Sequence, residues 1–579
     1  METHYTNEKN TQMVLDLLKK HNIKKIIASP GTTNIRLVAS MQQDDWFEMY
    51  SAPDERSAAY MACGMSEESG EPVVLTCTGA TASRNYLPGL TEAYYRKLPV
   101  LAITSAQFFG NVGHNIPQVL DRSSQLNDIV KYSVQIPSCY DEDMEWHCNV
   151  KINEALLELK RNGGGPVHIN LETKYSTNFD IKELPSFKKI DRFGYESELP
   201  LLEKERIGIF IGNHKVFTDY EVSLIEKFCE KYDAVVLRDH TSNYRGKYSV
   251  LFNIITNQTV ALDDINNFDL IIHIGDVSGA YPRFKCKETW RVNPDGEIRD
   301  TFKNITYVFE MSEKYFFEKY NNMSVDRNST NFFEEWSKKY DLLINKMPDL
   351  ELSNLYVASK LSKLIPDNSI IHFGILNSLR SWNYFNINRN IKCYCNTGGF
   401  GIDGILSSAI GAALANKEKT VYCILGDLAF FYDFNSLGNR EVPNNLKIVL
   451  INNGKGTEFR NYNHYASQFG DDADEFISAA GHYGNKSEQL VKNYCNSLQF
   501  TYYFVNLKDS LEESLEKFIG NNNKSLIEIF TNNKDESDSL QKMNSLNTSG
   551  SNKVKDNVKN TVKKIIGPNN FDKLKRIVK

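Results

Sequence analysis

The sequence predicts an α/β protein with three doubly wound parallel-sheet domains and a basic C-terminal tail. Short β-branched and apolar runs alternate with stretches of helical periodicity, which is the pattern of strands buried in a parallel sheet between covering helices. Two of these runs end in glycine-containing turns, as the strands of βα units do. The chain of 579 residues is also too long for one hydrophobic core, so several domains are expected.

The first domain is expected over residues 1–185. A helix over 12–21 precedes an apolar strand over 25–29, a turn at Pro30 and Gly31, and another helix, which together form a βα unit. The further strands predicted in this domain lie at 72–78, 99–104 and 166–171. Residues 186–200 are polar and flanked by prolines, which is typical of a linker.

The second domain, expected over residues 200–340, repeats the α/β pattern. Its strands are predicted at 207–211, 234–237, 270–274 and 305–309. The third of these runs into glycines over 274–279, but the spacing lacks the G-x-G-x-x-G pattern of a dinucleotide-binding turn. A structural role is therefore predicted for these glycines.

The third domain is expected over residues 350–531. Its strands are predicted at 369–373, 421–425, 448–452, 502–505 and 525–530. The following segment, 532–552, is rich in Ser and Asn and poor in apolar residues, which predicts a flexible linker.

The tail, 553–579, carries nine Lys or Arg against two Asp, and its apolar residues have helical spacing. This pattern predicts a short basic amphipathic helix. It is either a solvated or dimer-docking helix, or a weak attachment to an anionic membrane surface or partner.

Composition and charge exclude several classes of protein. No apolar run approaches the roughly 18 to 20 residues of a membrane span, and the polar start, 1–10, has no apolar region of a secretory signal. A cytoplasmic location is expected. The ten cysteines are scattered and form no disulfide or zinc pattern. A net charge of −6 argues against nucleic-acid binding by the body of the protein.

Two polar motifs close neighbouring strands of the third domain. Gly426 and Asp427 end the run at 421–425, and Asn453 follows the next run, 26 positions after Asp427. The carboxyl ends of parallel strands meet at one edge of a sheet, where ligands bind. An aspartate, an amide oxygen and a backbone carbonyl, assigned to Lys455, are hard oxygen ligands that suit Mg²⁺ beside a diphosphate. Gly426 allows the backbone to approach the phosphates closely.

With this GD…NN motif at this separation, the chain resembles the thiamine diphosphate (ThDP)-dependent enzyme superfamily. A second match is Asp54-Glu55-Arg56, which precedes a helix of small residues where that superfamily carries its cofactor-activating glutamate. Taken alone, Glu55 is equally an acid that stabilises a helix start. The resemblance covers roughly residues 11–531, in the order pyrimidine-binding, central and diphosphate-binding domain.

The resemblance implies roles for particular residues. Glu55 would bond the aminopyrimidine ring of ThDP and shift it to the tautomer that removes the thiazolium proton. Ile402 would be the apolar wedge that holds the cofactor bent; without the flanking glycines it would be an ordinary core residue. The other cofactor-binding residues implied by the motifs are Phe400, Gly401, Gly426, Asp427, Leu428 and Asn453.

Within the superfamily the chain is similar to the menaquinone-pathway synthases that add a succinyl semialdehyde unit to isochorismate. The shared phrases are Ser29-Pro30-Gly31, Asn377-Ser378 with Arg380, Gly401-Ile402-Asp403-Gly404 and Gly426-Asp427-Leu428 with Tyr432-Asp433. Gln118 also matches an active-site glutamine of that family.

Two arginines of those synthases are absent here. Thr33 stands where they have arginine after the Ser-Pro-Gly turn, and Thr397 stands where they have arginine after Asn396. Each loss removes bidentate carboxylate recognition worth about 1.5 to 3 kcal/mol. An acceptor other than isochorismate is therefore expected.

Two further residues are candidates for acid-base chemistry. Glu458 follows the Asn453 loop where carboxylates of related decarboxylases shuttle protons, and the alternative is a solvent-exposed carboxylate at a helix start. His114 lies in the loop that enters the partner subunit's active site in this superfamily, although most single loop histidines are surface residues.

The resemblance implies a Mg²⁺- and ThDP-dependent carboligase or decarboxylase. A 2-oxoacid would lose CO₂ and leave an enamine that is protonated or passed to an acceptor carbonyl. Because ThDP lies between two subunits in this superfamily, a homodimer or tetramer is implied. The alternative is a non-catalytic binding or regulatory subunit with the same fold, and the presence of Glu55, Asp427 and Asn453 favours the enzyme.

Overall fold

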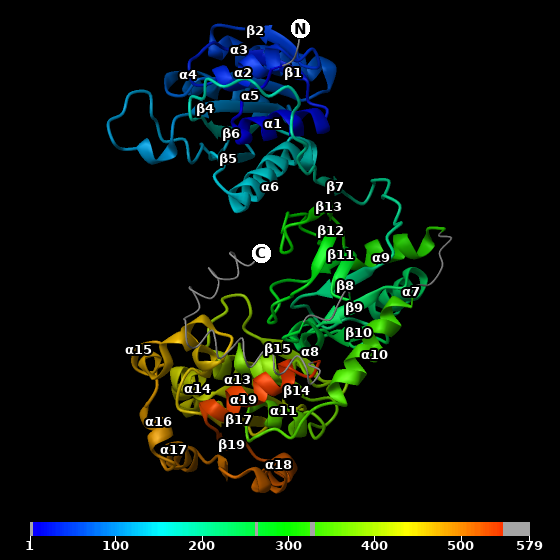
Figure 1. Cartoon of the computed structure of the whole chain (residues 1–579), viewed down its shortest axis with the longest axis vertical. Coiled ribbons are helices and arrows are strands. Elements are labelled where there is room, and N and C mark those ends of the chain that lie inside the picture. Colours follow the sequence, from blue (N-terminus) through cyan, green and yellow to red (C-terminus); the bar gives the residue numbers. More distant parts are fainter. Residues whose placement is uncertain (1–3, 261–264, 325–330, 548–579) are drawn as a thin grey trace, which may run out of the picture. The chain divides into compact units, whose positions relative to one another are not determined.

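Three parallel β-sheets surrounded by helices confirm the predicted fold class (Figure 1). The computed structural model describes residues 4–260, 265–324 and 331–547. The chain divides into two compact units, Met1–Leu199 with Pro294–Met311 and Pro200–Asn293 with Ser312–Lys579. No helix among the described residues is long and apolar enough to cross a membrane.

The first unit contains a six-stranded parallel sheet in the order β2-β1-β3-β4-β6-β5. Its strands are β1 (Lys25–Ala28), β2 (Glu48–Ser51), β3 (Val73–Cys77), β4 (Val100–Ala106), β5 (Tyr132–Ile136) and β6 (Val167–Glu172). Its helices are α1 (Lys9–Lys20), α2 (Ile35–Gln42), α3 (Glu55–Ser69), α4 (Thr81–Asn85), α5 (Leu87–Arg96) and α6 (Glu142–Glu158). A parallel pair, β7 (Asp191–Phe193) and β13 (Ile305–Phe309), also belongs to this unit.

Two hydrophobic clusters cover the two faces of this sheet. One joins β1, β4 and β6 to the apolar residues of α1, α2 and α6, and the other joins β1, β3 and β4 to α3 and α5. Helix α3 presents a face of small residues, and Gly89 of α5 lies so close to Ala59 that an added Cβ would collide with it. The small residues therefore bring the two helices close together and fix α3, which begins at Glu55.

The second unit contains the strands β8 (Ile207–Ile211), β9 (Val235–Arg238), β10 (Ser249–Leu251), β11 (Asn267–Ile274) and β12 (Lys285–Val292), in the order β10-β9-β8-β11-β12. The helices of this region are α7 (Asp219–Tyr232), α8 (Asn253–Thr256), α9 (Glu313–Asn322) and α10 (Phe332–Ile344). The glycine-containing turn after β11 begins at Gly275, and its backbone lies against Gly212 and Asn213, consistent with a structural role.

The same unit contains a second six-stranded parallel sheet, in the order β15-β14-β16-β17-β19-β18. Its strands are β14 (Ile370–Phe373), β15 (Lys392–Cys395), β16 (Val421–Gly426), β17 (Leu446–Asn452), β18 (Thr501–Val505) and β19 (Ser525–Phe530). The helices around it are α11 (Asn354–Leu361), α12 (Asn377–Trp382), α13 (Ile405–Ala415), α14 (Asp427–Asp433), α15 (Ala473–Phe476), α16 (Tyr483–Lys486), α17 (Leu490–Ser497), α18 (Leu511–Gly520) and α19 (Asn533–Asn544).

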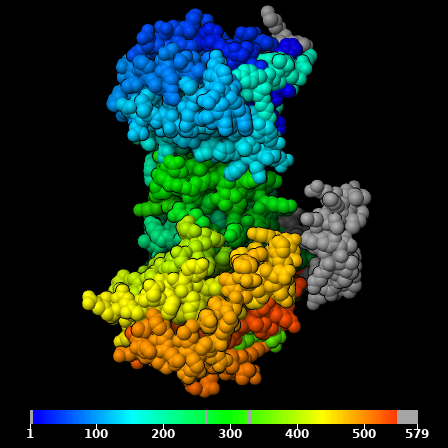
Figure 2. Space-filling view, turned by 90° about the vertical axis from the view of Figure 1, so that its left-hand side faces the viewer, coloured from blue at the N-terminus to red at the C-terminus, as the bar shows by residue number. Residues whose placement is uncertain are grey.

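Helix α19 corrects the prediction of a flexible linker over 532–552 for its described part, up to residue 547, and residues 548–552 lie outside the described residues. Asn532 caps the helix by accepting a hydrogen bond from the backbone N–H of Asp535. The Glu536 carboxylate accepts hydrogen bonds from Thr531 and from the backbone and side chain of Asn354, and Met543 is fully buried. Ser537 donates to the Arg460 carbonyl, and the red segment lies beside the yellow-orange one in Figure 2. The polar composition is thus explained by partners inside the fold.

Other differences concern individual strands. The prediction missed β2, β5, β10, β12 and β15, and it treated residues 186–200, which contain β7, as a linker only. Most of these strands lie at sheet edges and carry partly exposed side chains, so they lack a continuous apolar run. The basic amphipathic helix expected over 553–579 lies outside the described residues.

We expect a chain ending at Thr531 to be less stable than one ending at Asn547, because only the first removes α19. Burial of Met543 alone corresponds to roughly 1.5 to 3 kcal/mol. Thermal unfolding and limited proteolysis of the two truncated proteins measure the difference. Equal unfolding of both would show that α19 contributes nothing to the second unit.

Candidate active site

The buried carboxylate of Asp427 lies at the carboxyl edge of the sheet β15-β14-β16-β17-β19-β18, which is the third sheet of the chain. It is the first residue of α14, directly after β16, and is 2% exposed. Its Oδ2 atom accepts a hydrogen bond of 2.6 Å from the backbone N–H of Gly454 and lies 2.8 Å from Nε2 of His482. Because β16 pairs in parallel with β17, the two loops predicted to meet at this edge do meet.

The sheet order also places this edge at a topological switch point. From β14 the chain crosses to β15 on one side, whereas β16 and β17 lie on the other side. In open parallel sheets ligands bind in the crevice outside the carboxyl ends of the strands at such a point. Asp427 follows one of the two strands that flank this crevice.

The oxygen donors around Asp427 fit a hard cation. Asn453 is 8% exposed and follows β17 directly. The Lys455 ammonium is 2.6 Å from Asp474, so its side chain is used in an ion pair and its backbone carbonyl is the ligand atom that remains. Among the described residues no group of three or more His, Cys, Asp or Glu side chains could hold a metal. A metal here would therefore be held by one carboxylate, one amide and one carbonyl.

Gly426 leaves room for a phosphate group. Its φ of −84° is accessible to any residue, so the backbone conformation does not require glycine. A Cβ added there would have only the Ile451 carbonyl oxygen within 4.0 Å. The space beside the strand end is therefore open, and a side chain would fill it.

Buried hydrogen bonds hold the end of β17 at this edge of the sheet. Asn452, in β17, donates a 2.7 Å hydrogen bond to Glu528 of β19, and the Tyr502 hydroxyl donates to the same carboxyl group at 2.6 Å. Burial raises the pKa of Glu528 to about 7. These contacts fix the residue immediately before Asn453.

The loop 396–404 carries the residues expected to bend the cofactor. Ile402 is half-buried and packs against the hydrophobic cluster of the third sheet. Phe400 has a φ of 55°, and its ring centroid is 5.9 Å from that of Tyr281. A Cβ added to Gly401 would collide with the Asp403 carboxylate. Ile402 is thus held on a tightly folded loop and keeps part of its surface exposed.

In the first unit Glu55 begins α3, and Asp54 caps the helix by accepting from the backbone N–H of Ser57 at 2.7 Å. Asp54 therefore already supplies the stabilising acid at this helix start. Glu55 accepts a hydrogen bond of 3.2 Å from Asn85 of α4. Ala80, just before α4, has φ 58° and ψ −136°, a strained conformation for a residue with a side chain.

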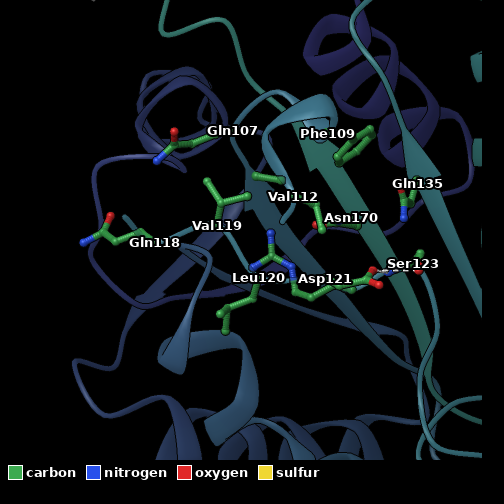
Figure 3. A pocket seen from close by; sticks show the side chains of 12 residues that line it. Gln107, Phe109, Val112, Gln118, Val119, Leu120, Asp121, Ser123, Gln135 and Asn170 are labelled. Carbon is green, nitrogen blue, oxygen red and sulfur yellow. Dashed lines mark hydrogen bonds between the residues drawn. The ribbon is translucent and has the colours of Figure 1, made fainter. Parts of the chain in front are cut away.

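Gln118 and His114 lie on one exposed loop after β4. Gln118 has a φ of 64° and lines a pocket of about 210 Å³ (Figure 3). In this view Gln107 and Gln118 lie on one side of the pocket, and Gln135 and Asn170 lie on the other. His114 is exposed and is not a lining residue of that pocket.

Glu458 is not the solvent-exposed carboxylate of the alternative interpretation. It lies in a 3-10 helix, Thr457–Arg460, and its side chain is 20% exposed. Both carboxylate oxygens accept from the Arg380 guanidinium, one of them at 3.0 Å, and Asn461 adds a bond of 3.3 Å. Burial would lower the pKa of Arg380, but the Glu458 carboxylate holds it above its ordinary value.

This ion pair lines a pocket of about 220 Å³ within the second unit. Its lining is rich in amide side chains, namely Asn253, Asn257, Asn383, Asn461, Asn463 and Asn544. The buried Nδ2 atom of Asn383 and the buried Oδ1 atom of Asn253 have no hydrogen-bond partner. The pocket thus offers neutral hydrogen-bonding groups beside the Arg380–Glu458 pair, and the exposed Arg283 also lines it.

The structure brings together, in the first unit, Glu55 with Asn85, and in the second unit Asp427 with Gly454 and His482. The sequence motifs indicated neither Asn85, the partner of Glu55, nor His482, the partner of Asp427, nor Arg122, which lines the pocket beside Gln118. No motif or spacing in the sequence indicates these residues, because the role of each depends on its contacts with residues elsewhere in the fold.

Known proteins show the same organisation. Residues 9–125 match the family model described as thiamine pyrophosphate enzyme, N-terminal TPP binding domain, and residues 377–529 match the thiamine pyrophosphate enzyme, C-terminal TPP binding domain. A 2-succinyl-5-enolpyruvyl-6-hydroxy-3-cyclohexene-1-carboxylate synthase of Phocaeicola vulgatus is 30% identical over 558 residues, which cover 91% of this chain and 96% of that protein.

The synthases of the same name from Bacteroides thetaiotaomicron and Flavobacterium johnsoniae are 30% and 28% identical. The first alignment covers 92% of this chain and 97% of the relative, and the second covers 90% and 95%. The similarity therefore extends over nearly the full length of both proteins.

Replacing Glu458 by Gln is expected to destabilise the protein by about 2 kcal/mol, because it leaves the partly buried Arg380 without its anion. The double variant Glu458→Gln with Arg380→Met should recover much of this loss. Thermal unfolding measures both. Glu441→Gln, in an exposed pair with Arg440, is the matched control and should have little effect. A double variant no more stable than the single one would contradict the pairing argument.

Glu528 should make stability depend on pH. Its folded pKa of about 7 lies above the ordinary 4.5, so the folded state holds the proton more tightly and loses stability as pH rises between these values. A shift of this size corresponds to about 3 kcal/mol. Urea unfolding at pH 5 and pH 8 measures the effect. From pH 5 to pH 8 the wild type should lose stability relative to Glu528→Gln, which has no carboxyl group to titrate. A difference that stays constant would exclude this carboxyl group as the cause.

Proposed function

Because the chain belongs to the thiamine diphosphate-dependent enzymes, we propose that it is a Mg²⁺-dependent carboligase or decarboxylase that acts on a 2-oxoacid. The observation that carries this proposal is the buried Asp427 carboxylate at the switch point, beside Asn453 and the open space at Gly426. Bound ThDP supplies the electron sink that cleavage next to a carbonyl requires.

The residues of the second unit would hold the diphosphate through the metal. Asp427, the Asn453 amide and the Lys455 carbonyl provide oxygen ligands, while Gly426 and Leu428 line the strand end. Ile402 would support the thiazolium from an apolar loop and exclude water there. A binding or regulatory subunit without activity would have no need to keep all of these groups.

Glu55 of the first unit would hold the proton on the aminopyrimidine ring nitrogen. The Asp54 cap supports this role, because α3 does not depend on Glu55 for its N-terminal acid. The Asn85 amide orients the Glu55 carboxylate. In this proposal two protomers are required, since ThDP in this superfamily lies between subunits, and the protein is a cytoplasmic homodimer or tetramer.

An acceptor other than isochorismate is supported by the two threonines that replace arginines. Thr33 is 3% exposed and bonds to Thr78 and to the Ser105 carbonyl. Thr397 is 2% exposed and accepts a 2.7 Å hydrogen bond from Asn213. Both side chains are buried and hydrogen-bonded inside the fold, so neither position offers a cation to a substrate carboxylate.

Purified protein with ThDP and Mg²⁺ is expected to release CO₂ from at least one member of a panel of 2-oxoacids, with and without aldehyde acceptors. Glu55→Gln should lower this turnover about 10²- to 10⁴-fold, because the variant cannot exchange a proton with the cofactor ring. Chelation of Mg²⁺ should abolish turnover and readdition should restore it.

The matched control is Glu142→Gln. Glu142 begins α6 after the capping residue Asp141, as Glu55 begins α3 after Asp54, and it is exposed. If a glutamate at a helix start were merely structural, both variants would behave alike. Unchanged turnover of Glu55→Gln would remove the proposed mechanism.

A further inference from the structure

Arg122 is a buried cation without an anion. The residue is 4% exposed in the loop that follows Gln118. Its guanidinium donates two long hydrogen bonds, 3.3 Å to the Ser83 hydroxyl and 3.4 Å to the Ser105 carbonyl, and its buried Nε has no partner. Among the described residues it forms no ion pair. Taking a guanidinium out of water without a counter-charge is unfavourable, so this arrangement needs an explanation.

The surrounding groups increase the need for an anion. Burial lowers the pKa of Arg122 to about 10, so it remains charged at neutral pH. His168 is fully buried, and burial together with the charges of Arg122 and Arg84 lowers its pKa to about 3. Burial raises the pKa of the Cys77 thiol to about 12. The histidine and the thiol are therefore neutral, and Arg84 is a second cation.

The neighbouring acid does not neutralise Arg122. Asp121 is exposed and accepts hydrogen bonds from the backbone and the hydroxyl of Ser123, at 2.9 and 2.6 Å (Figure 3). Gly79 accommodates the guanidinium, because a Cβ there would lie 2.8 Å from its NH1 atom. The fold thus makes space for the guanidinium, and Asp121, although it lines the same pocket, forms no ion pair with it.

The cation adjoins the pocket that Gln118 lines. Arg122 and Asp121 are its charged lining residues, and Gln107, Ser123 and Asn170 add neutral polar groups to a volume of about 210 Å³. The Asp121 carboxylate is already hydrogen-bonded to Ser123, so the guanidinium is the group that a ligand can neutralise. Phe109 and Val112 contribute apolar surface (Figure 3). Such a pocket suits a small organic anion with a short carbon chain.

Arg122 is also connected to the candidate catalytic glutamate. It donates to Ser83 of α4, and Asn85 of the same helix donates to Glu55. One short helix therefore positions both the glutamate and the guanidinium within the first unit.

We propose that Arg122 binds a carboxylate of a small-molecule substrate in this pocket. The inference rests on the proposed function and names the cation that takes the place of the two absent arginines. The carboxylate is not the one that leaves as CO₂, because a guanidinium on that group would stabilise the ground state more than the transition state.

Binding is tested on the full chain with succinate as a non-reacting dicarboxylate, succinamide as its neutral analogue and inorganic phosphate as a second anion. Succinate should raise the melting temperature of wild type and succinamide should not. Arg122→Met should reduce succinate affinity at least tenfold in calorimetry and should unfold, without ligand, at the same or a higher temperature. A less stable Arg122→Met variant would mean that the cation supports the fold and would overturn the proposal.

Arg96→Met is the matched control, because Arg96 lies in the same unit and is exposed in pairs with Glu67 and Glu92. It should keep the succinate response, and an equal loss in both variants would indicate a general charge effect. A melting temperature that rises with phosphate but not with succinate would show that the site takes a phosphoryl group, and would overturn the carboxylate assignment.

A kinetic readout separates this inference from the proposed function. Arg122→Met should raise KM for a dicarboxylic 2-oxoacid or a carboxylated acceptor at least tenfold, and should raise KM for pyruvate much less, because pyruvate has no second carboxylate. If no 2-oxoacid reacts, the proposed function fails while the succinate titration still decides the role of Arg122. If Arg122→Met leaves both the KM values and succinate binding unchanged, Arg122 does not bind the substrate carboxylate.

Discussion

The parallel pairing of β16 with β17 is the constraint on which the candidate site depends. It places Asp427 and Gly454 at the same edge of the third sheet, where the carboxylate accepts the backbone N–H at 2.6 Å. Asn452 is held by its hydrogen bond to the buried Glu528, so the next residue, Asn453, has a defined position. Oxygen ligands and open space at Gly426 follow from this pairing and not from any one side chain.

Charge pairing distinguishes the two pockets. In the second unit the buried guanidinium of Arg380 is neutralised by Glu458 beside a lining of asparagines, and the other cation of that pocket, Arg283, is exposed. In the first unit Arg122 has no such partner. A buried pair is internally complete, whereas a buried single charge gains most from an external ion. The two pockets therefore differ in the ligand chemistry they favour.

The two threonines show how the chain departs from its relatives without losing the fold. Thr33 links the loops after β1 and β3 through Thr78, and Thr397 links the loop before Ile402 to Asn213. Both hydroxyl groups thus connect separate segments of the chain.

The sequence by itself determined the fold class, the GD…NN motif and the helix start at Glu55, because these are periodic or local patterns of the chain. It did not reveal edge strands such as β2 and β15, whose side chains are only partly buried, or helix α19, whose polar residues find partners far along the chain. Only the tertiary structure decided that Glu458 is paired and Arg122 is not. Pairing depends on residues that are distant in sequence, and no local pattern contains that information.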